Sequence, residues 1–141
     1  MNETKNPLIE GLSELRLKYW GQTMQEDLAT MKEPDRDAIT KYLSRWIEKE
    51  KAERKTQMIQ SKVRSAKFRR LQTVESFDFK HSKMTEKVER QYLALHQSIS
   101  RENLPSAVFT GNAGAGKTHL ARALGYAACQ KGLTVLFLTA A

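Results

Sequence analysis

The segment that most constrains this chain is glycine-rich and lies near its C-terminal end. Residues 111–118 read Gly-Asn-Ala-Gly-Ala-Gly-Lys-Thr, the G-x-x-x-x-G-K-T pattern of a phosphate-binding loop. Glycines admit backbone conformations that a Cβ forbids, so successive amide groups can point inward at phosphate oxygens. In this pattern the lysine reaches the β- and γ-phosphates and the threonine hydroxyl binds Mg²⁺. The predicted nucleotide site consists of Gly111, Asn112, Ala113, Gly114, Ala115, Gly116, Lys117, Thr118 and His119, with Thr118 as the Mg²⁺ ligand.

The residues on either side of this loop have the character that a nucleotide-binding α/β fold requires. Residues 107–110 are a short apolar run, typical of a buried strand. Residues 119–131 are rich in Ala and Leu, which favours a helix that begins where the loop ends. Residues 134–138 form a second apolar run, and Gly132 suits the position just after a helix. The sequence therefore predicts the first strand, loop, helix and second strand of an α/β P-loop NTPase domain.

The first half of the chain is predicted to be entirely helical. Asn6 and Pro7 suit the cap and first position of a helix, and Gly21 is expected to interrupt the helical pattern. No Gly or Pro occurs from Asp35 to about Leu71, which predicts one long helix with a basic distal half. We expect the aromatic side chains of Tyr42 and Trp46 to pack in a core. The predicted domains are a helical domain, residues 1–72, and the beginning of an ATPase domain, residues 73–141.

Positive charge is concentrated in one stretch of the chain. The net charge is +8, and residues 54–74 contain seven Lys and Arg and no acid. Such a stretch can be a solvated helix face, but its cations lack local acidic partners, which favours contact with a polyanion. Phosphate contacts of this kind give affinity without sequence preference. The predicted DNA contacts are Lys62, Arg64, Lys67, Arg69 and Arg70.

Other classes of protein fit the composition poorly. The apolar runs are far shorter than a bilayer span requires, and the first residues lack the apolar segment of a signal peptide. These features predict no membrane segment and a cytoplasmic location. Cys129 is the single cysteine, so no disulfide framework exists, and we expect it to be a small buried residue.

Several segments together resemble one family, the IstB-like ATP-binding proteins. These are helpers of insertion-sequence transposition and are close to DnaC-type helicase loaders. The resemblance begins at Leu-Arg-Leu, residues 15–17, and continues in the charged helix at residues 46–54 and in Ala-Lys-Phe at 66–68. Phe-Asp-Phe at 77–79 looks like the family's entry to its ATPase domain. The most specific stretch is residues 116–125, in which His-Leu-Ala follows the Gly-Lys-Thr of the loop.

This resemblance implies an AAA+ ATPase with ATP and Mg²⁺ as its ligands. It also implies double-stranded DNA and a transposase as partners and an ATP-dependent homo-oligomer. A replicative helicase loader of the same architecture is the first alternative. An inert DNA-binding or interaction fragment is the second alternative. Nucleotide binding by the chain would distinguish the ATP-binding transposition helper from this inert fragment.

The chain departs from this family by ending early. The acidic Mg²⁺ motif, the sensor and the trans-acting arginine of such proteins come later than residue 141, so no catalytic residue is assigned. We expect the isolated chain to bind nucleotide weakly or not at all, to lack hydrolysis and to have a loose ATPase part. Phe77 and Phe79 are expected to form a hydrophobic clamp between the two domains, the alternative being a place beside adenine. For His119, packing or capping is expected before catalysis.

Overall fold

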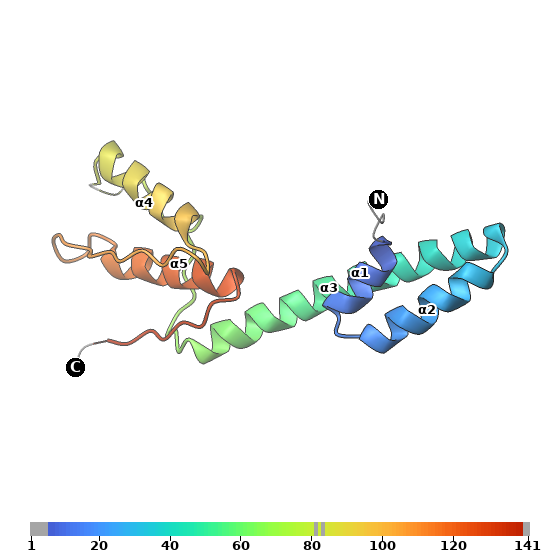
Figure 1. Cartoon of the computed structure of the whole chain (residues 1–141). Helices are drawn as coiled ribbons and strands as arrows, with labels where there is room; N and C mark the ends of the chain where they lie inside the picture. The colour runs from blue at the N-terminus through green and yellow to red at the C-terminus, as the bar shows by residue number, and fades with distance from the viewer. Residues whose placement is uncertain (1–5, 81, 83, 140–141) are drawn as a thin grey trace. The chain divides into compact units, whose positions relative to one another are not determined.

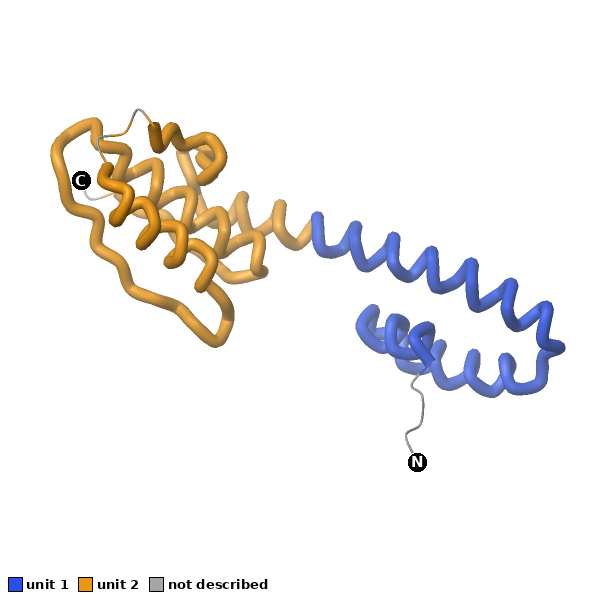
Figure 2. Tube along the Cα trace, turned by 90° about the horizontal axis from the view of Figure 1, so that it is seen from above, with its two compact units in different colours: residues 1–56 blue, residues 57–141 orange. Residues whose placement is uncertain are grey.

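The computed structural model describes residues 6–80, 82 and 84–139, and its regular elements in this part are five helices (Figure 1). The chain divides into two compact units, residues 1–56 and residues 57–141 (Figure 2). The helices are α1 (Pro7–Glu14), α2 (Lys18–Thr30), α3 (Glu33–Ser65), α4 (Glu86–Ser98) and α5 (Lys117–Gln130).

Two local features define the first helices of unit 1. The Asn6 side chain accepts a hydrogen bond from the amide of Leu8 at 3.1 Å, and proline follows it, so the predicted start of α1 is confirmed. The break between α1 and α2 lies at Arg16, whose φ is +62°. The interruption expected at Gly21 was wrong. This glycine is buried within α2, where a Cβ would lie 3.5 Å from the side chain of Ile9.

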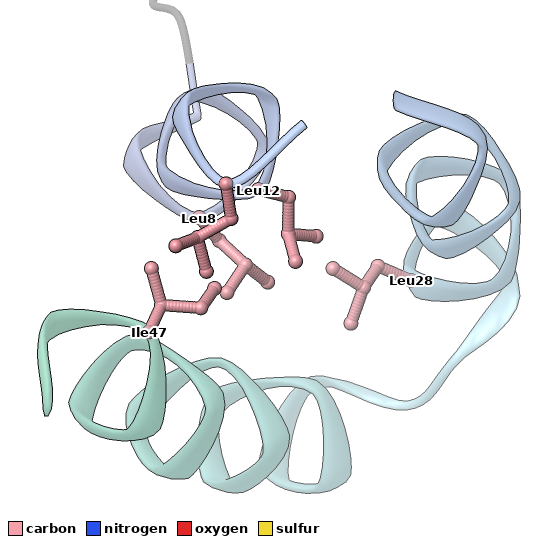
Figure 3. Packing of buried hydrophobic residues seen from close by; sticks show 5 residues of the cluster. Leu8, Leu12, Leu28 and Ile47 are labelled. Atoms are coloured by element: carbon pink, nitrogen blue, oxygen red, sulfur yellow. The ribbon is translucent and has the colours of Figure 1, made fainter. Parts of the chain in front are cut away.

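The core of unit 1 is a cluster of aliphatic side chains from all three helices. The buried members are drawn in Figure 3 and comprise Leu8, Leu12, Leu15, Leu28 and Ile47. Tyr42 and Trp46 were expected in this core, and that expectation was wrong, because they are 55% and 60% exposed. Neighbouring helical residues point about 100° apart, so once Ile47 faces the core, Trp46 is turned away from it.

Polar contacts also join the end of α1 to α3 within unit 1. The Lys51 ammonium lies 2.9 Å from Glu14 and 3.0 Å from Glu48, and these hydrogen bonds, that of Glu14 first, raise the pKa of Lys51. Arg54 donates to the Leu15 carbonyl at 3.1 Å and to Glu50 at 2.7 Å. Arg54, the first cation of the predicted basic stretch, is therefore engaged within its own unit.

Two helices are followed by residues with a left-handed backbone in unit 2. Helix α3 ends at Ser65, before the expected Leu71, and Lys67 then has a φ of +58°. Helix α5 is followed, as predicted, by Gly132, where φ is +78° and the amide donates to the Cys129 carbonyl at 2.9 Å. Cys129 is fully buried as expected, and burial raises the pKa of its thiol.

The two predicted strands are not present in the described residues. Residues 107–110 and 134–138 have no regular structure, and Val108 and Leu138 are 88% and 72% exposed. Strands need a neighbouring strand for their hydrogen bonds, whereas here the Phe137 amide donates to the Ala66 carbonyl at 2.9 Å. The described fold is therefore all-helical. Within it, no helix combines the length and apolar character that crossing a membrane requires.

Candidate phosphate-binding site

The glycine-rich loop lies in unit 2 and leads directly into α5. Its glycines all have positive φ, +142° at Gly111, +78° at Gly114 and +83° at Gly116. Gly116 is the N-cap of α5 and offers no side chain to its amides. Amide groups in the first turn of a helix have no partner within the helix, and together with the helix dipole they favour an anion. The loop thus has the backbone properties of an anion-binding site.

The Lys117 side chain turns back across this loop. Its ammonium donates to the Gly111 carbonyl at 2.8 Å and to the Asn112 carbonyl at 2.7 Å. The lysine cation is therefore held at the loop by two neutral acceptors. A phosphate oxygen, which is a charged acceptor, could take their place. Thr118 follows on the first turn of α5. Its hydroxyl is a hard oxygen donor of the kind that Mg²⁺ binds.

Residues 72–79 contact the first turn of α5. The Phe77 ring packs on Gly116, where a Cβ would lie only 2.8 Å from the ring carbon Cζ. Phe77 also meets the His119 ring edge-on, with the centroids 5.1 Å apart, and Phe79 at 4.8 Å. The two phenylalanines thus pack beside the loop, Phe79 lying 6.3 Å from the Tyr92 ring.

A chain of hydrogen bonds joins the same segment to α5. Arg122 donates to Oε1 of Gln72 at 2.8 Å, and the Gln72 amide nitrogen lies 3.0 Å from Nδ1 of His119. Nε2 of His119 lies 2.9 Å from the Thr73 carbonyl and 3.2 Å from the Ser76 hydroxyl. His119 thus packs on residues 72–77. Sequence reasoning missed Gln72 and Arg122, because two residues 50 positions apart do not form a local sequence motif.

The family follows from comparison with known proteins. Residues 11–141 match the sequence model of a family described as IstB-like ATP binding protein. The chain belongs to this family. The resemblance seen in the sequence is thereby confirmed.

A curated relative of this IstB-like chain comes from Geobacillus stearothermophilus. Its name assigns it to insertion sequence IS5376 and to ATP binding. The two are 32% identical over 104 residues, which are 73% of this chain and 40% of the relative. The chain therefore spans less than half of the relative's length. No solved structure matches the chain significantly.

In this IstB-like protein, a buried tyrosine supports α5 from the side of α4. The Tyr92 hydroxyl donates to the Leu120 carbonyl at 3.1 Å, and the residue is 4% exposed. Its ring lies 6.2 Å from that of Phe109, just before the glycine-rich loop. Burial raises the pKa of Tyr92 to about 12, and the charge of Glu75 acts in the same direction.

The predicted DNA-contacting cations do not share one helix face. Lys62 lies on α3 and donates to the Thr134 hydroxyl at 2.6 Å. Arg64 is on the last turn of α3, whereas Lys67, Arg69 and Arg70 lie in the connection after it. The division follows from the end of α3 at Ser65, after which Lys67 has a left-handed backbone. Across the described part of the chain, none of the recorded ion pairs includes any of these five residues.

Proposed function

We propose that this chain binds ATP and Mg²⁺ through residues 111–119 and serves as an ATP-dependent helper of DNA transposition. The observation that carries the proposal is the Lys117 ammonium, bonded to the carbonyls of Gly111 and Asn112 in a loop of positive-φ glycines. The family match and the insertion-sequence relative support the nucleotide and the biological setting. The α/β P-loop fold of AAA+ proteins and the domain boundary near residue 72 are part of this proposal.

The residues of the loop would divide the work of holding the nucleotide. Amide groups at the start of α5 would bind phosphate oxygens, since they lack partners within the helix. Lys117 would release the two loop carbonyls and bind the β- and γ-phosphates. The Thr118 hydroxyl would ligate Mg²⁺, which neutralises phosphate charge. Residues 72–79 would support this arrangement from one side of α5.

Calorimetry of ATP binding tests the nucleotide proposal. Replacement of Lys117 by Ala should weaken ATP binding about ten-fold or more, because a charged hydrogen bond contributes roughly 1.5–3 kcal/mol. Lys87→Ala removes an exposed lysine from the first turn of α4 and is the matched control, for which unchanged affinity is expected. Equal ATP affinity in Lys117→Ala and Lys87→Ala would contradict the assignment.

We further propose that nucleotide state controls contacts with double-stranded DNA and with a transposase, within an ATP-dependent homo-oligomer in the cytoplasm. The cations Arg64, Lys67, Arg69 and Arg70 would supply phosphate contacts, whereas Lys62 is bonded to Thr134. A helicase loader would use the same nucleotide site with a replicative partner. Co-purification with a transposase or with a helicase would distinguish these two functions. ATP binding by the chain would exclude the inert fragment.

A further inference from the structure

Residues 72–77 are attached to α5 at three successive points. Gln72 accepts from Arg122, the Thr73 carbonyl lies 2.9 Å from Nε2 of His119, and Phe77 packs on Gly116. The Gln72 amide that meets Arg122 also meets His119, so the first two attachments are linked. The segment is therefore fastened to the helix that begins at the glycine-rich loop.

The hydrogen bonds fix which ring nitrogen of His119 carries the proton. Arg122 is always a donor, so it must meet the oxygen of the Gln72 amide, and the amide NH₂ then faces His119. Nδ1 of His119 must accept this hydrogen bond. Nε2 consequently carries the proton and donates it to the Thr73 carbonyl.

The same contacts reach the phosphate-binding loop. Gly116 has a φ of +83°, and Phe77 fills the space on the Cβ side of this residue. The Phe77 ring also packs edge-on against His119. Movement of residues 72–77 would therefore remove the packing that holds Gly116. The amides at the start of α5 would then no longer be held in their present directions.

We propose that Gln72 and His119 are positioning residues for the phosphate-binding loop: by fastening residues 72–77 to α5 they hold Phe77 against Gly116 and keep the loop ready for a triphosphate. This proposal rests on the proposed ATP site. It assigns residues 72–77 an effect on the phosphate end of the nucleotide. A contact with the base would act at the other end, and the two roles can be separated by experiment.

Two ligands distinguish these roles in the full chain. Gln72→Leu removes both hydrogen bonds of the amide, and Gln130→Leu makes the same change at an exposed position on α5. Binding of Mg-ATP and of inorganic tripolyphosphate is measured by calorimetry for each. The positioning role predicts that Gln72→Leu weakens both ligands by the same factor, about three-fold or more, since the loss of a single hydrogen bond already corresponds to about three- to ten-fold. Gln130→Leu should leave both affinities unchanged.

Other outcomes overturn the proposal in distinct ways. Weakened ATP with unchanged tripolyphosphate would show that residues 72–77 contact the base. Unchanged affinity for both ligands would show that the segment has no influence on the site. Failure of the unaltered protein to bind ATP would instead overturn the proposed function. Circular dichroism of each variant reports whether the helices are retained.

A second variant covers the case in which Gln72→Leu fails to fold. In Gln72→Glu, the carboxylate still accepts from Arg122 but has no NH₂ to donate to Nδ1 of His119, so the variant keeps one attachment and changes the other. The positioning role predicts that Gln72→Glu weakens Mg-ATP and tripolyphosphate by one common factor. Unchanged affinity for both ligands in a folded Gln72→Glu would overturn the proposal.

Discussion

Phe77 occupies the space that a side chain on Gly116 would need. A Cβ at Gly116 would lie 2.8 Å from Cζ of the Phe77 ring, a separation that real Cβ atoms essentially never show. Gly114, in the same loop, also has a positive φ but has nothing within 4 Å of the corresponding Cβ position. The two glycines therefore separate the effect of backbone strain from the effect of the Phe77 ring.

Alanine at these glycines should have unequal effects. Both substitutions force a Cβ into the left-handed region, at a cost of about 1–2 kcal/mol. Gly116→Ala should lower ATP affinity further than Gly114→Ala, because it also displaces Phe77. Phe77→Ala should partly restore the affinity of Gly116→Ala and should give no such gain to Gly114→Ala. Calorimetry of the two double variants checks this pattern, and equal rescue of both would contradict the packing of Phe77 on Gly116.

A second pair of glycines tests the core of unit 1. At Gly11 a Cβ would lie 2.7 Å from Cγ2 of Ile47, whereas at Gly21 the nearest atom is 3.5 Å away. Gly11→Ala should destabilise unit 1 by about 1–3 kcal/mol through overpacking. Gly21→Ala should be neutral or stabilising by up to about 1 kcal/mol, as alanine favours helices. Urea unfolding followed by tryptophan fluorescence measures both, since Trp20 and Trp46 lie in this unit. A stabilised Gly11→Ala would refute the packing.

Burial of Tyr92 should make the free energy of unfolding of unit 2 decrease at high pH. Its pKa in the folded protein is raised to about 12, above the usual value of about 10, because burial disfavours the phenolate. The contribution is therefore fully present below about pH 10 and is lost as the pH rises towards 12. Phenolate absorbance should show a late-titrating tyrosine that Tyr92→Phe removes. The exposed Tyr19 is the control, since Tyr19→Phe should leave the late step in place.

The sequence predicted elements whose signals lie close together along the chain. Asn6 with Pro7 marks the start of α1, and Gly132 marks the end of α5. Local signals of this kind did not predict the helix ends that are followed by a non-glycine residue in the left-handed conformation. Arg16 and Lys67 do so just beyond the ends of α1 and α3, at points where neither residue type predicts a break.

The remaining errors concern partners that the sequence does not reveal. Apolar residues 134–138 read as a strand, but a strand also needs a neighbour, and the described residues supply none. Trp46 was placed in the core because it is apolar, although its neighbour Ile47 takes that position. In the candidate site, the glycines and Lys117 could be recognised from their spacing. The attachment of His119 to Gln72 joins residues 47 positions apart and could be seen only in the structure.

Removal of cations tests the proposed DNA surface. Replacing Arg64, Lys67 and Arg69 with Gln should weaken binding to all duplex sequences alike. It should also reduce the slope of log K against log salt by about one unit for each phosphate that the variant no longer neutralises. The control replaces Lys41, Arg45 and Lys49, three cations of α3 in unit 1, and should leave the slope unchanged. Fluorescence anisotropy gives both slopes. Equal slopes for the two triple variants would favour a solvated surface.

Amide hydrogen exchange can show which residues hold a bound nucleotide and so tests the proposed phosphate site itself. Mg-ATP should slow exchange at residues 111–119, whose amides would bind phosphate oxygens. The protection should be weakened in Lys117→Ala and retained in Lys87→Ala. ATP binding that is detected by calorimetry but leaves exchange at residues 111–119 unchanged would place the nucleotide elsewhere and contradict the proposed site.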